Sequence, residues 1–363
     1  MMGNIASVDV ANTLNTWYVH IKKREVSQAV ELRDEIKHMI DNMEENQDVL
    51  LYFNILDYRF KVLMEDISGK PTIDEFKRIK TDDMLSFYFY LFKGMYESAK
   101  NNYSEALALF RVAERKLDKV YDEIEKAEFH YKIGTLYYFN KVTLLSHHHL
   151  TTAKDIYKGH GGYSIQTINC TMLLALNYID DGRLGKAEEM LLDCVDRLIE
   201  KDDKRLLSLA YYDLGFLKIQ TDDHTDAIYY FNKALSTDNL KESAPISYLQ
   251  CVYEYARSSY KLNRLEDALK WVNEGLSFSD EQLNENFTIK FKILRSCYTQ
   301  PVQRFGNIKE GLKLLEEKKA YVDLEALAPD VAKIYKALDM HREATYFLEV
   351  ALHSSMLTGK EII

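Results

Sequence analysis

Pairs of small residues recur along the chain at a nearly constant interval, and this repeat restricts the fold more than any other feature. The two members of each pair are 7 positions apart and lie within an amphipathic run. The first residues of the first five pairs are separated by 40, 41, 40 and 41 positions. The pairs are Ala106/Ala113, Ser146/Ala153, Ala187/Cys194, Ala227/Ala234, Ala268/Gly275 and Ala344/Ala351. Such a period predicts a fold built from stacked units.

A further small residue lies 12 positions before each of these pairs, at Gly94, Gly134, Ala175, Gly215, Ala256 and Ala332. An aromatic, Tyr137, Tyr178 or Tyr335, follows three of them by 3 positions. This combination is the tetratricopeptide (TPR) pattern, in which two antiparallel helices approach closely where side chains are small. We therefore predict an all-α fold in which residues 84–363 form a right-handed superhelical array of about seven TPR-like helix pairs.

The residues that break regular structure agree with a helical fold. Only 4 prolines and 14 glycines occur in 363 residues, too few for the many turns of an all-β fold or for a Gly-rich nucleotide-binding fold. We expect Pro245, Pro301 and Pro329 to lie between helices, where a missing N–H costs nothing.

The first 67 residues do not join the repeat and are predicted to form a three-helix bundle, with helices over about 8–22, 26–43 and 48–67. Residues 68–83, SGKPTIDEFKRIKTDD, combine Gly, Pro and alternating charge and predict a linker. The predicted order is therefore bundle (1–67), linker (68–83) and TPR domain (84–363).

Charge and cysteine usage exclude several classes of function. With 47 Lys and Arg against 57 Asp and Glu the net charge is −10, so we expect no direct nucleic-acid partner. The four cysteines are far apart with no C-x-x-C spacing, which favours a reducing compartment over a disulfide or zinc scaffold. The most apolar stretch, near residues 84–92, is about half a membrane span. We expect a cytoplasmic protein without a membrane partner.

Motifs of catalytic chemistry are missing from the sequence: it has no Gly-rich phosphate loop, no G-x-S-x-G and no H-E-x-x-H. The run His147, His148, His149 could suggest a metal site. Neighbours on a helix are about 100° apart, so a metal would need a further ligand such as Glu125 or Asp155. The alternative is a packed histidine face, and we expect no metal or cofactor bound by this chain.

The segment Asp41–Phe60 has the most distinctive local pattern of polar and apolar residues. An acidic helix end is followed by Gln47 and then by an apolar stripe that includes Leu50 and Tyr58. From the residues alone, Asn46 or Asp48 could simply cap a helix, with Leu50 in the core.

Three motifs in order give the chain a resemblance to a known family: MEENQDVLLYF at 43–53, KGMYE at 93–97 and DEIEKAEFHYK at 122–132. Together with a bundle that precedes a long TPR array, they resemble the Rap family of bacilli, which comprises response regulator aspartate phosphatases and their peptide-regulated relatives. The resemblance covers essentially the whole chain. It implies docking on a two-component response regulator and, in some members, hydrolysis of the aspartyl phosphate of its receiver domain.

The resemblance also implies roles for particular residues. The catalytic glutamine of the family falls on Gln47, whose amide would hold a water in line with the phosphorus, while Mg²⁺ is expected in the receiver domain of the partner. The positions that match regulator contacts are Leu50, Tyr58, Asp122, Glu125 and Tyr163. Tyr58 stands where the family often has Phe.

The regulator of the family is a short secreted signalling peptide that binds in the TPR groove. The matched peptide-binding positions are Asp180 and Asp213, the second of which is typically Asn in the family. We add Tyr212 and Tyr253, because the first helices of the third to fifth repeats should face the groove. The net charge of −10 favours a peptide with Lys or Arg. In the inhibited state, the bundle should pack on the repeats and hide the surface around Gln47, Leu50 and Tyr58.

Other functions stay open at this point. Family members can sequester the DNA-binding domain of a transcription factor without removing phosphate, and a TPR array can also serve as a generic adaptor. A peptide-responsive transcription factor would need a helix-turn-helix at its N-terminus. The basic patch Lys22-Lys23-Arg24, with Lys37 beyond it, is not accompanied by a convincing recognition helix.

Overall fold

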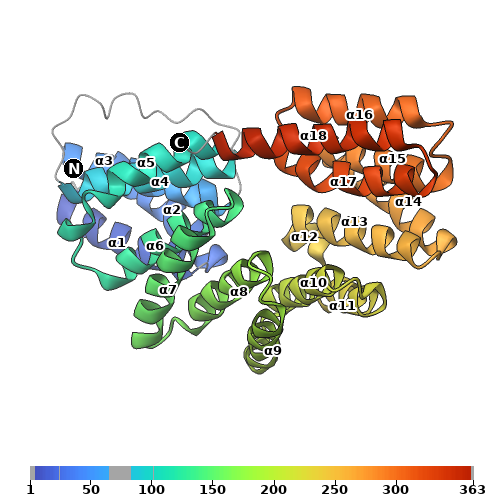
Figure 1. Ribbon diagram of the computed structural model, residues 1–363. Helices are drawn as coiled ribbons and strands as arrows, with labels where there is room; N and C mark the ends of the chain where they lie inside the picture. Colours follow the sequence, from blue (N-terminus) through green and yellow to red (C-terminus); the bar gives the residue numbers. More distant parts are fainter. Residues whose placement is uncertain (1–4, 24, 65–82, 101, 361–363) are drawn as a thin grey trace. The chain divides into compact units, whose positions relative to one another are not determined.

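The computed structural model describes residues 5–23, 25–64, 83–100 and 102–360 (Figure 1). Regular structure in this part of the chain is helical, and the only β-type pairing is an isolated bridge between Ile5 and Met43. The prediction of an all-α fold is confirmed. The chain divides into two compact units, residues 1–136 and 137–363.

The first unit contains the predicted bundle together with the helices that follow it. Its elements are α1 (Ser7–Lys23), α2 (Val26–Asp41), α3 (Gln47–Leu63), α4 (Asp83–Ala99), α5 (Tyr103–Glu114), the short 3₁₀ helix η2 (Leu117–Lys119) and most of α6 (Glu123–Phe139). The predicted linker at 68–83 lies almost entirely outside the described residues, as does the predicted extension of the third helix to residue 67.

Aromatic side chains form the core of the first unit. The indole of Trp17 is fully buried, donates to the carbonyl oxygen of Ala29 at 2.7 Å, and stacks on the ring of Phe53. The bundle also packs on α4, where the rings of Tyr58 and Tyr96 are 5.0 Å apart. Bundle and first repeat helices therefore share one continuous core.

The second unit consists of helices that follow one another with short turns. They are α7 (Thr143–Gly159), α8 (Ser164–Asp180), α9 (Leu184–Lys201), α10 (Lys204–Gln220), α11 (His224–Thr237), α12 (Leu240–Ser243), α13 (Pro245–Lys261), α14 (Leu265–Glu281), α15 (Glu285–Thr299), α16 (Phe305–Glu317), α17 (Tyr321–Ala337) and α18 (His341–Lys360). Neighbouring helices pack as pairs, such as α10 with α11 and α17 with α18. The first helices also contact each other, α8 with α10, α10 with α13, and α13 with α15. They therefore share one face of the unit.

The small residues of the repeat lie where helices meet. A Cβ atom at Gly215 would lie 2.5 Å from the ring of Phe231 on the paired helix, and a Cβ at Gly94 would lie 2.7 Å from the ring of Phe110. Such distances are shorter than any van der Waals contact, so only glycine permits this approach. The sequence prediction that small residues mark helix contacts is confirmed at these positions.

The prolines agree with the expectation at two of three places. Pro245 is the first residue of α13, and Pro301 follows the end of α15. Pro329 was expected between helices, and this prediction is wrong, because it lies inside α17. An internal proline loses one backbone hydrogen bond. The neighbouring Leu327, Ala328 and Val331 are buried, and their packing holds the helix together despite this loss.

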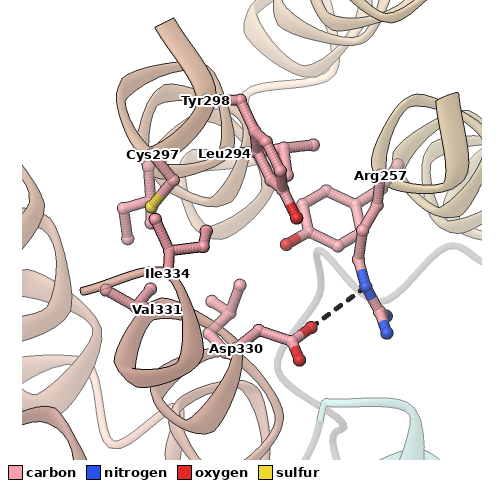
Figure 2. Close-up of a pocket in the computed structure, with 10 residues that line it drawn as sticks. Arg257, Leu294, Cys297, Tyr298, Asp330, Val331 and Ile334 are labelled. Carbon is pink, nitrogen blue, oxygen red and sulfur yellow. Dashed lines mark ion pairs between the residues drawn. The ribbon is translucent and has the colours of Figure 1, made fainter. Parts of the chain in front are cut away.

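A half-open cavity lies between α13, α15 and α17, with an empty volume of about 270 Å³ that includes open solvent (Figure 2). Leu294 and Cys297 of α15 and Val331 of α17 give it an apolar lining. The ion pair between Arg257 and Asp330 joins α13 to α17 beside it (Figure 2). The cavity thus extends the face formed by the first helices.

No helix in the described ranges combines the length and apolar character needed to span a bilayer.

Candidate functional site

Gln47 is the first residue of α3, and its backbone position is set by the residue before it. The side chain of Asn46 caps the helix by accepting from the N–H groups of Asp48 and Val49, at 3.1 and 3.2 Å. The Gln47 side chain is exposed, and its amide nitrogen is 3.4 Å from a carboxylate oxygen of Glu45. A capped helix end therefore presents a side-chain amide to solvent.

The two apolar contact positions on α3 differ in exposure. Leu50, one turn from Gln47, is half-buried, whereas Tyr58 is only 7% exposed. The Tyr58 ring packs on Tyr96, its buried hydroxyl has no hydrogen-bond partner among the described residues, and burial raises the pKa of this phenol. In this structure Leu50 is available at the surface and Tyr58 belongs to the core.

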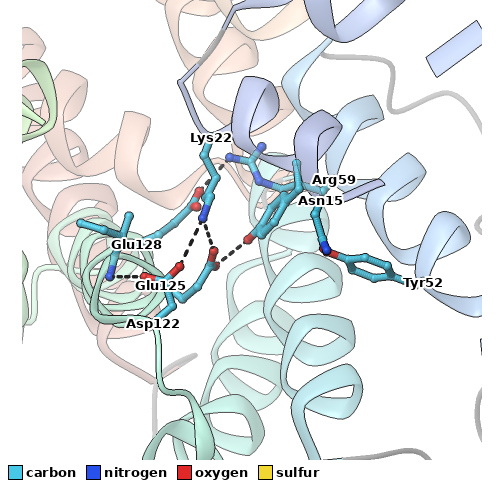
Figure 3. A network of polar contacts seen from close by, with 9 residues as sticks. Asn15, Lys22, Tyr52, Arg59, Asp122, Glu125 and Glu128 are labelled. Atoms are coloured by element: carbon cyan, nitrogen blue, oxygen red, sulfur yellow. Dashed lines mark hydrogen bonds and ion pairs between the residues drawn. The ribbon is translucent and has the colours of Figure 1, made fainter. Parts of the chain in front are cut away.

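The acidic positions at the start of α6 join a buried polar network (Figure 3). Figure 3 shows Lys22 between Asp122 and Glu125, at 3.5 and 2.6 Å from their carboxylate oxygens. The Tyr18 hydroxyl donates to the other oxygen of Glu125 at 2.5 Å. Glu125 is 1% exposed, so both of its oxygens find partners from α1 inside the core.

A second ion pair of the network connects α3 with α6. Arg59 and Glu128 are both buried, with a nitrogen–oxygen distance of 2.7 Å. Burial is the largest single influence and acts to raise the pKa of Glu128, but the charges of Arg59, Lys132 and Lys22 and the hydrogen bond from Arg59 together outweigh it, so the net shift is downward. Glu128 is therefore held as a carboxylate.

Glu125 has a different electrostatic balance from Glu128. Burial, opposed by Lys22 and reinforced by the charge of Glu128, raises the pKa of Glu125 to about 7. Burial and the charge of Glu125 raise the pKa of Tyr18, so this phenol remains a hydrogen-bond donor. The network joins α1 and α3 to α6 by directional, charged contacts.

Sequence reasoning missed Tyr18, Arg59 and Glu128 and assigned Lys22 only to a basic patch. A signal was present, since Tyr18 and Lys22 are four residues apart and Glu125 and Glu128 are three apart, so each pair shares one helix face. Nothing in the sequence indicates that these two faces meet.

Tyr163 lies in the second unit, at the N-terminal end of α8. Its carbonyl oxygen accepts from the N–H of Thr167, and its half-buried ring stacks on Tyr157 with ring centres 5.7 Å apart. The structure therefore gives Tyr163 a role in packing at this helix start.

Asp180 and Asp213 lie on the adjacent first helices α8 and α10. The Asp180 carboxylate is 3.1 Å from the ammonium of Lys141. Asp213 is 8% exposed, and within the described ranges its carboxyl has no hydrogen-bond or ion-pair partner. Burial raises the pKa of Asp213 to about 8. Of the two matched positions, one carboxyl is paired and one is not.

Tyr212 and Tyr253 line the same series of first helices. Burial, followed by the charges of Glu254 and Asp213, raises the pKa of Tyr212, whose ring packs on Phe231. Tyr253 lines the cavity between α13, α15 and α17 and packs edge-on against Phe291. Sequence reasoning did not anticipate the cavity or the Arg257–Asp330 ion pair beside it.

Two of the three histidines of the run are packed in the structure, whereas His148 is exposed. His147 is 3.1 Å from the hydroxyl of Tyr178, and the ring of His149 stacks on Tyr137. Among the described residues, no group of three or more His, Cys, Asp or Glu side chains is placed to hold a metal ion.

Comparisons with known proteins place this architecture in a family. Residues 4–65 match the family model for the N-terminal part of response regulator aspartate phosphatase H. The regulatory protein RapG of Bacillus subtilis (strain 168) is 31% identical over 367 residues, with both chains covered completely. The chain belongs to the Rap family. Another Rap protein, response regulator aspartate phosphatase I of the same organism, is 30% identical over 90% of this chain and 85% of its own.

Solved structures of Rap proteins agree with this assignment. A Rap protein complexed with competence and sporulation factor has a TM-score of 0.89 at 29% identity, covering 98% of this chain and 99% of that one. The apo form of RapI has a TM-score of 0.72 at 28% identity, with the same shares of both chains covered. The fold predicted from the repeat is therefore that of the Rap family.

Proposed function

We propose that this protein is a peptide-regulated phosphatase for the aspartyl phosphate of a two-component response regulator. The observation that carries the proposal is Gln47, an exposed amide at the capped start of α3 within the segment that matches the family model. A solvent-facing amide can accept from and donate to one water molecule at once. It can therefore orient that water toward a phosphoryl group on a docked partner.

The proposed reaction needs orientation more than acid–base chemistry. An aspartyl phosphate is already activated, so holding water in line with the phosphorus lowers the barrier by positioning. Gln47 supplies the amide, while the half-buried side chain of Leu50, one turn further along α3, gives an apolar contact for the receiver domain. The Mg²⁺ expected in such a receiver belongs to the partner. Its phosphorylated aspartate supplies the bond that breaks.

The network around Glu125 supports a regulated rather than a permanently active enzyme. Asp122 and Glu125 are candidate regulator contacts, yet Lys22 and Tyr18 of the same unit engage their carboxylates. A regulator that used Glu125 would have to displace these partners. Ionic contacts suit such an exchange, because their desolvation cost largely offsets their attraction.

Peptide binding is proposed for the face formed by α8, α10 and α13. This face carries Asp180, Tyr212, Asp213 and Tyr253, and it continues into the cavity beside the Arg257–Asp330 ion pair. Carboxyl and phenol groups above an apolar hollow suit a short peptide with both a basic and an apolar side chain.

Sequestration of a regulator without hydrolysis is the second candidate. Relatives at the same level of identity carry two kinds of name. RapG is named a regulatory protein, whereas the other relative is named response regulator aspartate phosphatase I. Both functions would use the surface of the bundle, and Gln47 is essential only for hydrolysis.

The test uses the full chain and a panel of response regulators, each as an intact protein, an isolated phosphorylated receiver domain and an isolated DNA-binding domain. Gln47→Ala should retain receiver binding and lose at least 100-fold in the rate of phosphate release. Gln28→Ala is the matched control, because Gln28 is exposed on α2 of the same bundle.

Three outcomes separate the alternatives. Equal rates for Gln47→Ala and the parent would remove Gln47 from the mechanism. Binding of a DNA-binding domain with no phosphate release from any receiver would establish sequestration instead. Binding of neither domain would leave the adaptor function.

A further inference from the structure

Three acidic side chains of α6 face the bundle, and among the described residues of the bundle two cations meet them. Asp122, Glu125 and Glu128 follow one another at intervals of three residues, so they share one face of the helix. Lys22 of α1 lies between Asp122 and Glu125, and Arg59 of α3 pairs with Glu128 (Figure 3). The cluster therefore holds one more carboxyl than it has cations from the described bundle.

Glu125 is the most deeply buried of the three acids, and it shares its cation. Glu128 has the guanidinium of Arg59 at 2.7 Å, whereas Lys22 lies near both Asp122 and Glu125. The side chain of Asp122 is 50% exposed, so water screens its charge. Glu125 is 1% exposed. An ionised Glu125 therefore adds an excess negative charge where water is most fully excluded.

The titratable groups around Glu125 come from four helices. They are Tyr18 and Lys22 of α1, Tyr52 and Arg59 of α3, Tyr88 of α4, and Asp122, Glu128 and Lys132 of α6. Burial and then the charge of Glu125 raise the pKa of the Tyr52 and Tyr88 phenols, so both stay uncharged. Lys132 acts on Glu128, whose pKa is shifted downward. Within this cluster, Glu125 is thus the carboxyl suited to hold a proton near neutral pH.

The hydrogen bonds of Glu125 can form in either protonation state. Lys22 donates to Oε1 at 2.6 Å, and the hydroxyl of Tyr18 lies 2.5 Å from Oε2. A hydroxyl donates to a carboxylate but can also accept from a carboxyl O–H, so a proton fits on Oε2 without the loss of either contact. What changes on ionisation is therefore the buried charge and not the set of partners.

We propose that Glu125 is a proton switch for the packing of the bundle on α6. While its carboxyl keeps the proton, the two other carboxylates face two cations, and α1 and α3 stay packed on α6. When the proton passes to solvent, the excess negative charge loosens this contact. No bond other than the carboxyl O–H bond breaks. The inference goes beyond the proposed function and does not depend on the catalytic role of Gln47.

The switch responds to pH in one direction. Burial is the main cause that raises the pKa of Glu125 to about 7, from an ordinary value of 4.5. Between these values the packed state binds the additional proton, so each unit of rising pH weakens the contact by up to tenfold. Outside this window both states carry the same charge and the dependence ends. A regulator that contacts Glu125 would therefore bind more weakly in acid.

The experiment follows hydrogen exchange of the full chain by mass spectrometry from pH 5.5 to 8.5. Exchange is measured in peptides from α1 and from the start of α6, and each rate is divided by the intrinsic rate of the same sequence at that pH. In the parent, we expect the protection of both segments to fall by up to tenfold per pH unit until pH about 7. In Glu125→Gln, whose amide keeps both contacts without a charge, protection should stay at the acid value of the parent throughout.

Glu123→Gln is the matched control, because it removes an exposed carboxyl from the same turn of α6 and should leave the profile of the parent unchanged. Lys22→Met tests the switch through its partner. Without the cation that opposes the upward shift in the pKa of Glu125, the midpoint of the profile should move to higher pH. A flat profile in the parent, a profile in Glu125→Gln equal to that of the parent, or a midpoint that Lys22→Met leaves in place overturns the inference.

Discussion

Glu125 in the first unit and Asp213 in the second are both carboxyls buried on a repeat helix, and they differ in what surrounds them. Glu125 receives Lys22 at 2.6 Å and the hydroxyl of Tyr18 at 2.5 Å. Asp213 receives neither a cation nor a donor in the described residues. Burial is the main cause that raises both pKa values, to about 7 and about 8.

The difference shows how one protein can use the same chemistry for two purposes. A buried carboxyl with its partners inside the unit fixes which helices pack together. A buried carboxyl without partners brings no such directional contact, and its burial favours the protonated form. Substituting Glu128, the second buried acid of the network around Glu125, and Asp213 by their amides tests this contrast.

The largest effect is expected at the ion pair that accompanies Glu125. Glu128→Gln removes the counter-charge of buried Arg59, whose guanidinium cannot lose its proton, and should lower the free energy of unfolding by about 3 kcal/mol. Urea denaturation measures it. Glu189→Gln is the control, since the pair with Lys186 is exposed and its loss should change stability by less than about 0.5 kcal/mol. Similar values for the two variants would contradict a structural role for the network.

Asp213→Asn should raise the free energy of unfolding at neutral pH, whereas Glu128→Gln lowers it. In the parent, the unfolded chain ionises Asp213 above pH about 4 while the folded chain keeps the proton up to about 8, so stability falls as pH rises between these values. This single group contributes a slope of about 1.4 kcal/mol per pH unit. The variant lacks the slope and should be more stable than the parent at pH 7. Denaturation curves from pH 5 to 8 test this, and a parallel profile for the variant would show that Asp213 is ionised in the folded state.

Packing around α10 should be tight, whatever the charge of Asp213. Gly215 lies two residues beyond Asp213, and a Cβ there would approach Phe231 to 2.5 Å. Gly215→Ala should therefore cost about 1–3 kcal/mol by overpacking. Gly185→Ala on α9 meets nothing within 4 Å and should be neutral or stabilising. A thermal melt that ranks the two variants in reverse order would argue against the close approach of α10 and α11.

The smallest effect on stability is expected at Gln47. Its side chain is exposed and, among the described residues, hydrogen-bonds only to Glu45, so Gln47→Ala should change the free energy of unfolding by less than about 0.5 kcal/mol. Chemical denaturation of Gln47→Ala provides the check. A large loss of stability would mean that Gln47 acts in the fold and not at a docked phosphate.

Local periodicity in the sequence is enough to predict the helical repeat. Gly94 and Gly215 mark helix contacts because a close approach demands a missing side chain wherever it occurs. The cap at Asn46 follows from side-chain chemistry next to its own backbone. The same local reasoning failed at Pro329, where burial of the neighbouring side chains keeps a helix that the proline alone would interrupt.

Only the tertiary structure decides which faces meet. Lys22 and Glu125 are separated by 103 positions, and no spacing along the chain shows that their helices pack together. The isolation of Asp213 is equally invisible in the sequence, which contains Lys141 and Arg257 as possible partners but not the ion pairs that occupy them. Side-chain spacing acts through the backbone of one helix, whereas the pairing of buried charges depends on how separate helices pack and on how much water they exclude.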